Sequence, residues 1–579
     1  MIFQTRSCAA MKERQIFFLS KQNIFLTFSL KFMIVYDILC VSVFLHSTND
    51  RHARTFYRKC ISRFFVTQES LFKKIYGRAP KVYAAFVMLL ISQAKGWRKE
   101  NMFTQINNFI TWFDGVVWGL PLIILILITG FLLTVRLGFL QVRHLGKALK
   151  FMVRNEEGGE GEVTSFGALC TALSATIGTG NIVGVATALA AGGPGALFWM
   201  IVAAFFGMAT KYTEGFLAIK YRTIDEEGHV LGGPFYYIEN GMGKKWKWLA
   251  KIFAFFGVCV GLMGIGTFTQ VNGIASAVTN FFDPNTSWAI HLFGRDISWV
   301  VVIAGLIVTV CTALVIIGGI KRIANVSQVV VPFMAVLYVV FAVLLLLCNV
   351  TKIPDAIVQI VQGAFGYGDS IQGIRAVAGG VLGAMMAAMQ NGVARGIFSN
   401  EAGLGSAPIA AAAAKTKDTV RQGLVSMTGT FIDTIVICTM TGLAIVIAGS
   451  WANPDLKGVA ITTVAFQSGL PFPSVVSSFV LMICLAFFAF TTILGWDYYS
   501  ERCLEYLSNR NKTVVKVYRW IYVLAVFIGP YLTVAAVWTI ADIFNGLMAI
   551  PNVIALIALS GVVAKETRDY FKEFDRLSK

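Results

Sequence analysis

The stretch SATIGTGNIVGVATALAAGGPGALFW, residues 174–199, decides the fold. Its glycines at positions 178, 180 and 184 resemble the start of a nucleotide-binding loop, yet they interrupt a long apolar run. A dinucleotide loop needs a strand before it and an acidic residue about 20 positions after it. The preceding residues, FGALCTALSATI, are typical of a helix, and residues 163–213 contain no acidic side chain. We therefore interpret the stretch as an interrupted membrane helix.

The chain as a whole is too apolar for a water-soluble protein. Of its 579 residues, 56% are hydrophobic and 14% are charged, and the mean hydropathy is +0.69. Soluble proteins carry roughly a quarter of their residues as charges. The apolar runs are continuous over about 20 residues, as in membrane helices, whereas barrel strands alternate in polarity over about 10 residues. We expect an all-α polytopic membrane protein.

Eleven apolar segments follow residue 110, with short polar loops between them. One alternating set of loops, together with the C-terminal tail, holds 26 Lys and Arg, and the other set holds four. Positive residues gather in cytoplasmic loops. The pattern therefore predicts eleven crossings, a cytoplasmic C-terminus and an external residue 110. The crossings are expected near 115–136, 168–190, 195–219, 250–280, 298–319, 326–349, 377–413, 422–449, 474–498, 517–537 and 540–564.

The first hundred residues fit this topology poorly. They carry +12 of the formal net charge of +18 and would lie outside the membrane. A twelfth crossing near 24–46 would resolve the conflict, but it would place Lys31 and Asp37 in the membrane interior, which is costly. We favour a start at Met102. Residues 1–101 are then a basic extension, non-native or poorly ordered, in front of a membrane domain at 102–579.

An interrupted helix exposes backbone groups inside the membrane, where irregular backbone is tolerated only beside a cavity. The N–H groups that begin the second half-helix near Asn181 favour an anion. The carbonyls of Ala175 and Ile177 favour a small cation, and a carboxylate beside Na⁺ suits this geometry. Helix packing through GxxxG at 180–184 is an alternative, but it leaves the polar Thr179 and Asn181 unexplained.

A second interrupted segment occurs at 377–413, in VAGGVLGAMMAAMQNGVARGIFSNEAGLGSAPIAAAA. Polar residues again break an apolar run in its middle, beginning with Ser399. Counted from the helix at 168–190, five crossings precede this second break. An odd-numbered set inverts the set that follows it, so the sequence predicts an inverted five-plus-five repeat with one extra helix in front.

Three stretches now resemble a known family. They are GTGNIVGVATALAAGGPGALFWM (178–200), GIFSNEAGLGSAPIAAAA (396–413) and TTILGWDYYSER (491–502). They closely resemble the sodium:alanine symporters, the alanine/glycine:cation symporter family, and the resemblance runs from about residue 105 to the end. It implies a LeuT-like fold and import of a small neutral amino acid, alanine or glycine, coupled to Na⁺. It also implies a multi-pass protein of the bacterial inner membrane. Coupling to H⁺, or transport of glutamine, is the alternative within the family.

The first break is the expected substrate site. Gly178, Thr179, Gly180 and Asn181 are expected to hold the substrate carboxylate through amides and a hydroxyl. Gln270, in GTFTQVNGIASAV, is a polar group in an apolar span on a helix that borders the site in this fold. It is expected to bind the substrate amine or carboxylate, and its alternative is a hydrogen bond to a neighbouring helix.

The eighth core helix, by resemblance, supplies hydroxyl ligands to Na⁺. Thr492 and Thr491 are assigned to the ion, facing the carbonyls of Ala175 and Ile177, since hydroxyl and carbonyl oxygens suit a hard cation. The alternative is that both threonines hydrogen-bond the preceding helical turn. Trp496 lies one turn after Thr492 and is expected to cap the substrate side chain. A place in an interfacial tryptophan belt is its alternative.

The second break carries the remaining candidates. Carbonyls at Ser399 and Asn400 are expected to meet the substrate ammonium. Glu401 is an intramembrane carboxylate and therefore a functional candidate. It is expected to bind a cation, to carry a proton or, as we prefer, to pair with Arg395 and hold the broken helix together. Asp433, in GTFIDTIVICT, poses the same question.

Other classes of function fit less well. GxSxG, HExxH and the phosphate-binding GxxxxGK[ST] are absent, and the ten Cys and five His show no metal-ligand spacing. A channel is the main alternative of a different class, but two mid-membrane breaks suit a bound solute better than a continuous pore. Lys211 and Glu214, three residues apart, are expected to form a local ion pair. The sequence leaves open the identity and handedness of the amino acid, Na⁺ versus H⁺, and the stoichiometry.

Overall fold

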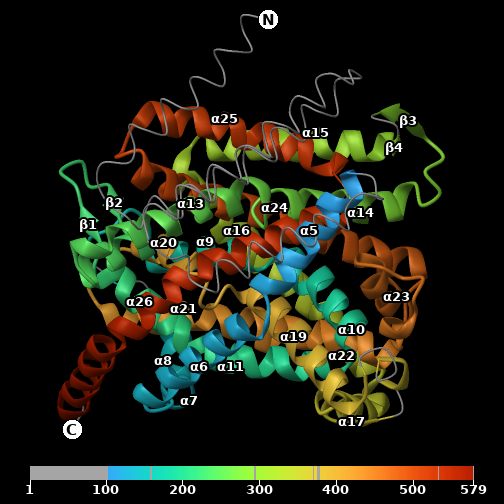
Figure 1. Ribbon diagram of the computed structural model, residues 1–579, viewed down its shortest axis with the longest axis horizontal. Coiled ribbons are helices and arrows are strands. Elements are labelled where there is room, and N and C mark those ends of the chain that lie inside the picture. Colours follow the sequence, from blue (N-terminus) through green and yellow to red (C-terminus); the bar gives the residue numbers. More distant parts are fainter. Residues whose placement is uncertain are drawn as a thin grey trace, which may run out of the picture. The chain divides into compact units, whose positions relative to one another are not determined.

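The computed structural model describes residues 102–577 apart from 155, 157–158, 293–294, 369–370, 375–378 and 533 (Figure 1). The described chain is almost entirely helical, which confirms the predicted all-α class. The basic extension at 1–101 and the alternative crossing near 24–46 lie outside the described residues. Two antiparallel pairs, β1–β2 (Thr223–Ile224 with Val230–Leu231) and β3–β4 (Ala289–Leu292 with Arg295–Ser298), are the strands of the described part.

Nine described helical runs are long and apolar enough to cross a membrane, and a tenth is bent by 47° at a break. The nine runs are built from α5 (Met102–Val117) and α6 (Leu120–Arg136), α11 (Gly195–Lys220), α13 (Lys247–Met263) and α14 (Phe268–Phe282), α15 (Trp299–Ile316), α16 (Gly319–Cys348), α21 (Thr419–Thr430), η7 (Phe431–Cys438) and α22 (Thr439–Ala448), α24 (Ser474–Leu507), α25 (Lys512–Ile528) and α26 (Val534–Leu577). The bent run joins α9 (Ser165–Thr176) to η2 (Gly180–Gly184) and α10 (Val185–Gly192).

These ten runs coincide with ten of the eleven expected crossings. The eleventh, expected at 377–413, is α19 (Val381–Asn400) followed by α20 (Ala407–Ala412). The crossing expected at 250–280 is not continuous, because the chain leaves helical geometry at 264–267, where Gly264 and Gly266 come close together in sequence. Sequence analysis also missed two shorter helices, α17 (Ile353–Ala364) and α23 (Val459–Gly469), because neither is long enough to span a bilayer.

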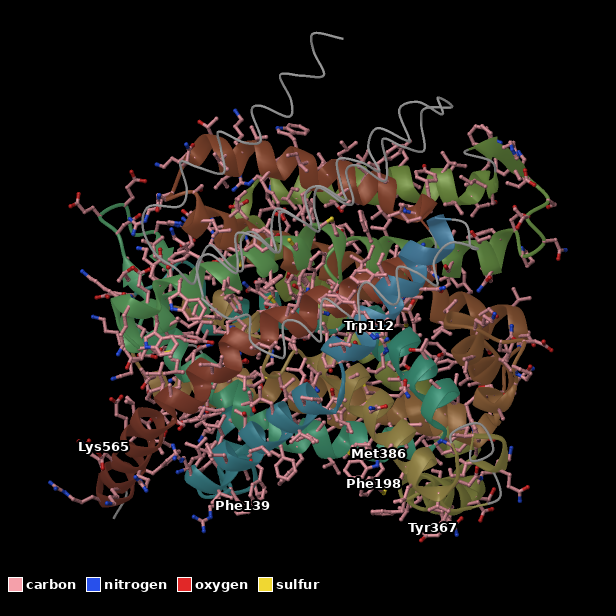
Figure 2. The ribbon with its side chains drawn as sticks, viewed as in Figure 1. Trp112, Phe139, Phe198, Tyr367, Met386 and Lys565 are labelled. Atoms are coloured by element: carbon pink, nitrogen blue, oxygen red, sulfur yellow. The ribbon has the colours of Figure 1, made fainter. Side chains whose placement is uncertain are left out.

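The outer surface of the helices is apolar. On α15 and α16 the exposed side chains include Ile303, Leu306, Leu314, Phe333 and Val340. Figure 2 places the labelled Phe139 and Tyr367 at the lower margin of the view, and these side chains are 47% and 59% exposed. Exposed apolar surface of this extent is unfavourable in water. It therefore faces lipid, and the protein is an integral multi-pass membrane protein.

The long helix α24 crosses the middle of the bundle (Figure 1) and contacts α9, α13, α14, α16, α23 and α25. Its approach to α9 is close because a glycine faces α9 at the crossing. A Cβ atom at Gly495 would lie 2.7 Å from Cβ of Ala175. Small residues allow membrane helices to come this near to one another. The crossing brings the residues of α24 around position 492 beside the interrupted helix.

Candidate substrate and cation site

The first break, residues 177–179 between α9 and η2, presents backbone N–H groups to polar side chains. The N–H of Gly178 donates to Asn181 Oδ1 (2.9 Å), and the N–H of Thr179 donates to Gln270 Oε1 (3.0 Å). Asn181 and Gln270 are both buried. The structure thus brings the predicted amides and Gln270 together, with two neutral amide oxygens as the acceptors of the break.

The side of the first break that faces α24 is rich in oxygen atoms. Thr492 Oγ1 lies 3.3 Å from the carbonyl oxygen of Ile177 and donates to the carbonyl one turn earlier in α24 (3.0 Å). Gly178 permits this approach, since a Cβ there would lie 2.5 Å from Thr492 Oγ1. Thr491 is turned away, with its Oγ1 3.4 Å from Met334 Sδ of α16. The structure therefore does not bring Thr491 to the first break, because the next residue of a helix points about 100° away, and its assignment to Na⁺ stays a prediction.

The second break, residues 401–406 between α19 and α20, contains three residues with left-handed backbone. Their φ angles are +57° at Glu401, +90° at Gly403 and +80° at Gly405. Such a conformation is uncommon for a residue with a side chain, and at Glu401 it ends α19. The two interrupted helices touch right beside their breaks, because a Cβ at Gly180, at the start of η2, would lie 3.1 Å from Cα of Ser399, near the end of α19. Two interrupted helices five crossings apart in sequence therefore lie next to each other inside the bundle.

Asp433 of η7 connects the two breaks. Its Oδ1 accepts a hydrogen bond from Asn181 Nδ2 (2.7 Å), and its Oδ2 accepts bonds from Ser399 Oγ (2.9 Å) and Thr434 Oγ1 (2.6 Å). Asn400 Nδ2 donates to the same Thr434 hydroxyl (3.0 Å). The Asp433 side chain is fully buried, and its bonded partners are neutral. A carboxylate held inside the bundle between both breaks is positioned to respond to what either break binds.

Glu214, on the neighbouring helix α11, hydrogen-bonds the backbone of the second break. Its Oε1 accepts the N–H groups of Gly403 (3.1 Å) and Gly405 (3.2 Å) and the Nδ2 of Asn552 (2.7 Å). The predicted Lys211–Glu214 ion pair is wrong. Lys211 Nζ has no hydrogen-bond partner among the described residues, because the Glu214 carboxylate is turned to the break and accepts its N–H groups.

The predicted pair of Arg395 with Glu401 is also wrong. Arg395 donates to both carboxylate oxygens of Asp542 on α26 (2.9 and 2.6 Å). Glu401 instead accepts from Ser406 Oγ (2.6 Å) and from Trp496 Nε1 (2.8 Å). Arg395 lies more than a turn before the end of α19 and faces α26, whereas the left-handed turn at Glu401 directs its side chain toward α24. The two residues therefore bind different helices.

Trp496 lies inside the bundle and does not belong to an interfacial belt. It is 1% exposed, and its ring meets Tyr499 edge-on with the centroids 5.4 Å apart. A Cβ at Gly266, in the gap between α13 and α14, would lie 2.7 Å from the Trp496 Cβ. The indole therefore has a defined position one turn from Thr492, between the α13–α14 gap and the second break.

One hydrogen-bonded network outside the membrane-spanning helices connects loops that the charge pattern predicts to be cytoplasmic. Val163, before α9, forms a parallel bridge with Ala414, after α20. His229 lies between Glu162 (Nδ1 to Oε1, 2.9 Å) and Glu505 (Nε2 to Oε1, 3.0 Å), and we call these three side chains the loop latch. The hydrogen bonds to Glu162 and then to Glu505 raise the pKa of His229 to about 9. The latch joins the segment before α9 to the end of α24.

Comparison with known proteins identifies the family of this chain. Residues 103–578 match the model of the sodium:alanine symporter family. The chain belongs to this family. An uncharacterized transporter of Haemophilus influenzae is 52% identical over 468 residues, which cover 81% of this chain and 96% of that protein. The sodium/alanine symporter AgcS of Methanococcus maripaludis is 47% identical, over 79% of this chain and 95% of AgcS.

Other members of the sodium:alanine symporter family carry other names. The probable sodium/glutamine symporter GlnT of Bacillus subtilis is 38% identical, over 79% of this chain and 90% of GlnT. Among solved structures, MhsT in complex with L-phenylalanine matches with a TM-score of 0.46 and 14% identity, over 69% of this chain and 90% of that chain. Membership of the family makes this protein a transporter.

Several buried polar residues around the breaks were not predicted from the sequence. Glu214 was placed in an ion pair, and neither Asn552 nor Asp542 was singled out. Each interrupts an apolar segment, as in MAIPNVIAL around Asn552. A polar residue inside a membrane helix needs a partner within the bundle. That signal marks these residues as interior, although it does not say which break or helix they contact.

Proposed function

We propose that this protein is a secondary active symporter that imports alanine or glycine together with Na⁺. The observation that carries the proposal is the contact of the two interrupted helices at Gly180 and Ser399, beside their breaks, with the Thr492 hydroxyl next to the first break. Backbone donors and backbone acceptors then lie side by side in the bundle interior. The relative AgcS, named as a sodium/alanine symporter, supports this choice of substrate and ion.

The substrate carboxylate is proposed to bind the first break, at the N–H groups of Gly178 and Thr179. Asn181 Oδ1 and Gln270 Oε1 accept these N–H groups in the structure. A carboxylate is a stronger acceptor than a neutral amide oxygen, because hydrogen bonds to charged groups are roughly twice as strong. It therefore displaces one or both side chains. Gln270 and Asn181 are then free to bind the substrate, as expected from the sequence.

Na⁺ is proposed to bind between the carbonyl end of α9 and α24. The donor set is the carbonyl oxygens of Ala175 and Ile177 and the Thr492 hydroxyl, which fits a hard monovalent cation. Thr492 already donates its proton to a carbonyl of its own helix (3.0 Å), so its oxygen lone pairs can turn to the ion. The ion and the substrate carboxylate would lie on adjacent residues of one break. Their mutual attraction then makes each stabilise the binding of the other.

The second break and α24 complete the proposed site. The ammonium group of the substrate meets acceptors at Ser399 and Asn400, next to the carboxylate of Asp433. Trp496 covers the substrate side chain. The rocking of interrupted helices against the remaining helices, in a LeuT-like five-plus-five arrangement, alternates access to the site. The charge pattern of the loops supports a C-terminus in the cytoplasm, and the family resemblance supports the bacterial inner membrane.

Uptake of labelled alanine into proteoliposomes tests the proposal. We expect accumulation when Na⁺ is high outside and little uptake when Na⁺ is equal on both sides. Uptake that ignores both a Na⁺ and a pH gradient would overturn symport, and a non-saturable flux would favour a channel. Accumulation driven by a pH gradient alone, or of glutamine in preference to alanine, would replace the ion or the substrate, as the names of two Bacillus subtilis relatives suggest.

A further inference from the structure

Glu401 is a fully buried carboxylate to which the proposed function gives no role. It is 0% exposed and stands at the first position of the second break, two residues after Ser399. Its two oxygens have separate partners. Oε2 accepts from Ser406 within the break, and Oε1 accepts from the indole Nε1 of Trp496 on α24 (2.8 Å). The bond from Trp496 therefore links the Glu401 side chain to a different helix, α24.

The backbone at Glu401 makes this contact possible. Its φ of +57° is rare for a residue with a side chain, and it turns the carboxylate from α19 toward α24. A glycine would adopt this backbone more readily. The chain keeps a glutamate at a position that disfavours side chains, although the next two left-handed positions of the break are both glycine. The side chain therefore has a use that offsets the cost of its backbone.

The partner of this bond is the residue that faces the substrate side chain. Tyr499 meets the Trp496 ring edge-on, Gly266 lies close to the Trp496 Cβ, and the Glu401 carboxylate accepts the indole N–H. A tryptophan side chain turns about two bonds, and a hydrogen bond at its far end (2.8 Å) restricts both.

We propose that Glu401 is a positioning residue that orients the Trp496 indole and so limits the transported amino acid to one with a small side chain. The proposal rests on the proposed function, because it assigns Trp496 to the substrate. Glu401 acts through Trp496 and does not touch the substrate. When the carboxylate is lost, the indole can swing away, and the site admits larger side chains. Pocket contacts of this kind discriminate one methylene by roughly 10- to 200-fold.

The test compares uptake of leucine and alanine in proteoliposomes, as the ratio of their kcat/KM values. Glu401→Met removes the acceptor at nearly constant shape, and we expect this ratio to rise at least tenfold, with the alanine KM rising more than its kcat falls. Glu401→Gln keeps an oxygen acceptor and should stay within about threefold of wild type. Tyr499→Phe is the matched control. It removes a hydroxyl beside Trp496 that has no partner among the described residues, and it should leave the ratio unchanged.

A double-mutant cycle separates positioning from a general structural effect. Trp496→Phe lacks the N–H, so adding Glu401→Met to it should change the ratio less than twofold. A ratio unchanged in Glu401→Met, or a full additional effect on the Trp496→Phe background, would overturn the proposal. If Glu401→Met does not fold, the leucine-to-alanine ratio of kcat/KM is compared between Trp496→Phe and Glu401→Gln. A ratio that rises in Trp496→Phe and stays at the wild-type value in Glu401→Gln supports the proposal. Equal ratios in these two variants refute it. Wild-type protein that transports no alanine refutes the proposed function instead, so the two failures are distinguishable.

Discussion

Replacing Gly178 by alanine is the sharpest steric test of the cation side of the site. The new Cβ would lie 2.5 Å from Thr492 Oγ1 and 3.0 Å from Gln270 Oε1, whereas ordinary contact begins near 3.4 Å. Gly178 is absent from the left-handed residues, so its backbone tolerates alanine and the cost is steric. Helix α24 cannot shift Thr492 far from the new methyl group, because Gly495 on its next turn already packs against Ala175.

The expected magnitude follows from overpacking. Adding a methyl group to a well-packed interior costs about 1–3 kcal/mol. If all of it appears at the cation site, the apparent Na⁺ affinity falls by roughly 5- to 150-fold. The assay is the Na⁺ concentration that gives half-maximal alanine uptake, read beside the thermal unfolding temperature of the purified protein. Gly184→Ala is the matched control, since a Cβ there meets nothing within 4 Å.

A double variant locates the effect. Thr492→Ala removes the oxygen that the new Cβ meets, so Gly178→Ala on that background should lose much of its destabilisation while Na⁺ dependence stays weak. The reasoning is refuted if Gly178→Ala keeps the wild-type Na⁺ dependence, or if Gly184→Ala harms it equally.

Two further predictions concern charges away from the first break. Arg395→Met should lower stability by about 3–5 kcal/mol, because it leaves Asp542 buried without its bidentate partner. Thermal unfolding measures this, and the double variant with Asp542→Leu should recover part of the loss; equal stability of Arg395→Met and wild type would contradict the pairing. Folding raises the pKa of His229 from about 6.5 to about 9. The loop latch therefore makes its full contribution to the free energy of unfolding below pH 6.5, and this contribution disappears as the pH rises through 9. With 27% of the side chain exposed, the contribution is on the order of 1 kcal/mol. Unfolding temperatures from pH 6.5 to 9.5 should fall more in wild type than in His229→Gln, and parallel profiles would argue against the latch.

Both breaks were predictable from the sequence, because glycines and polar residues inside an apolar run leave few alternatives to an interrupted helix. The approach of Thr492 to Ile177 was predicted through the family resemblance, and the structure places the two together. Neighbours across helices were not predictable in the same way. The partner of Arg395 depends on which face of α19 meets α26, and the direction of Glu401 depends on one left-handed φ.

The break between α13 and α14 shows a different limit. Gly264 and Gly266 stand in a run as apolar as its surroundings, and isolated glycines are common in continuous membrane helices. GLMGIGTF around 261–268 contains one polar residue, Thr267, and isolated glycines, a pattern that continuous membrane helices also show. The chain departs from helical geometry there because Gly266 must lie against Trp496, a contact that no local pattern reveals.

The central claim is that an amino-acid carboxylate and Na⁺ bind next to each other at the first break. Equilibrium binding of alanine to the purified protein, titrated at several Na⁺ concentrations, tests it most directly. Linkage requires that Na⁺ raises the alanine affinity by the same factor by which alanine raises the Na⁺ affinity. We predict that Na⁺ raises the alanine affinity of the wild type by a factor of 10 or more, which corresponds to a coupling free energy of about 1.4 kcal/mol or more. We expect this coupling to be lost in Thr492→Ala. Alanine binding that is equally tight with and without Na⁺ in the wild type would contradict the claim.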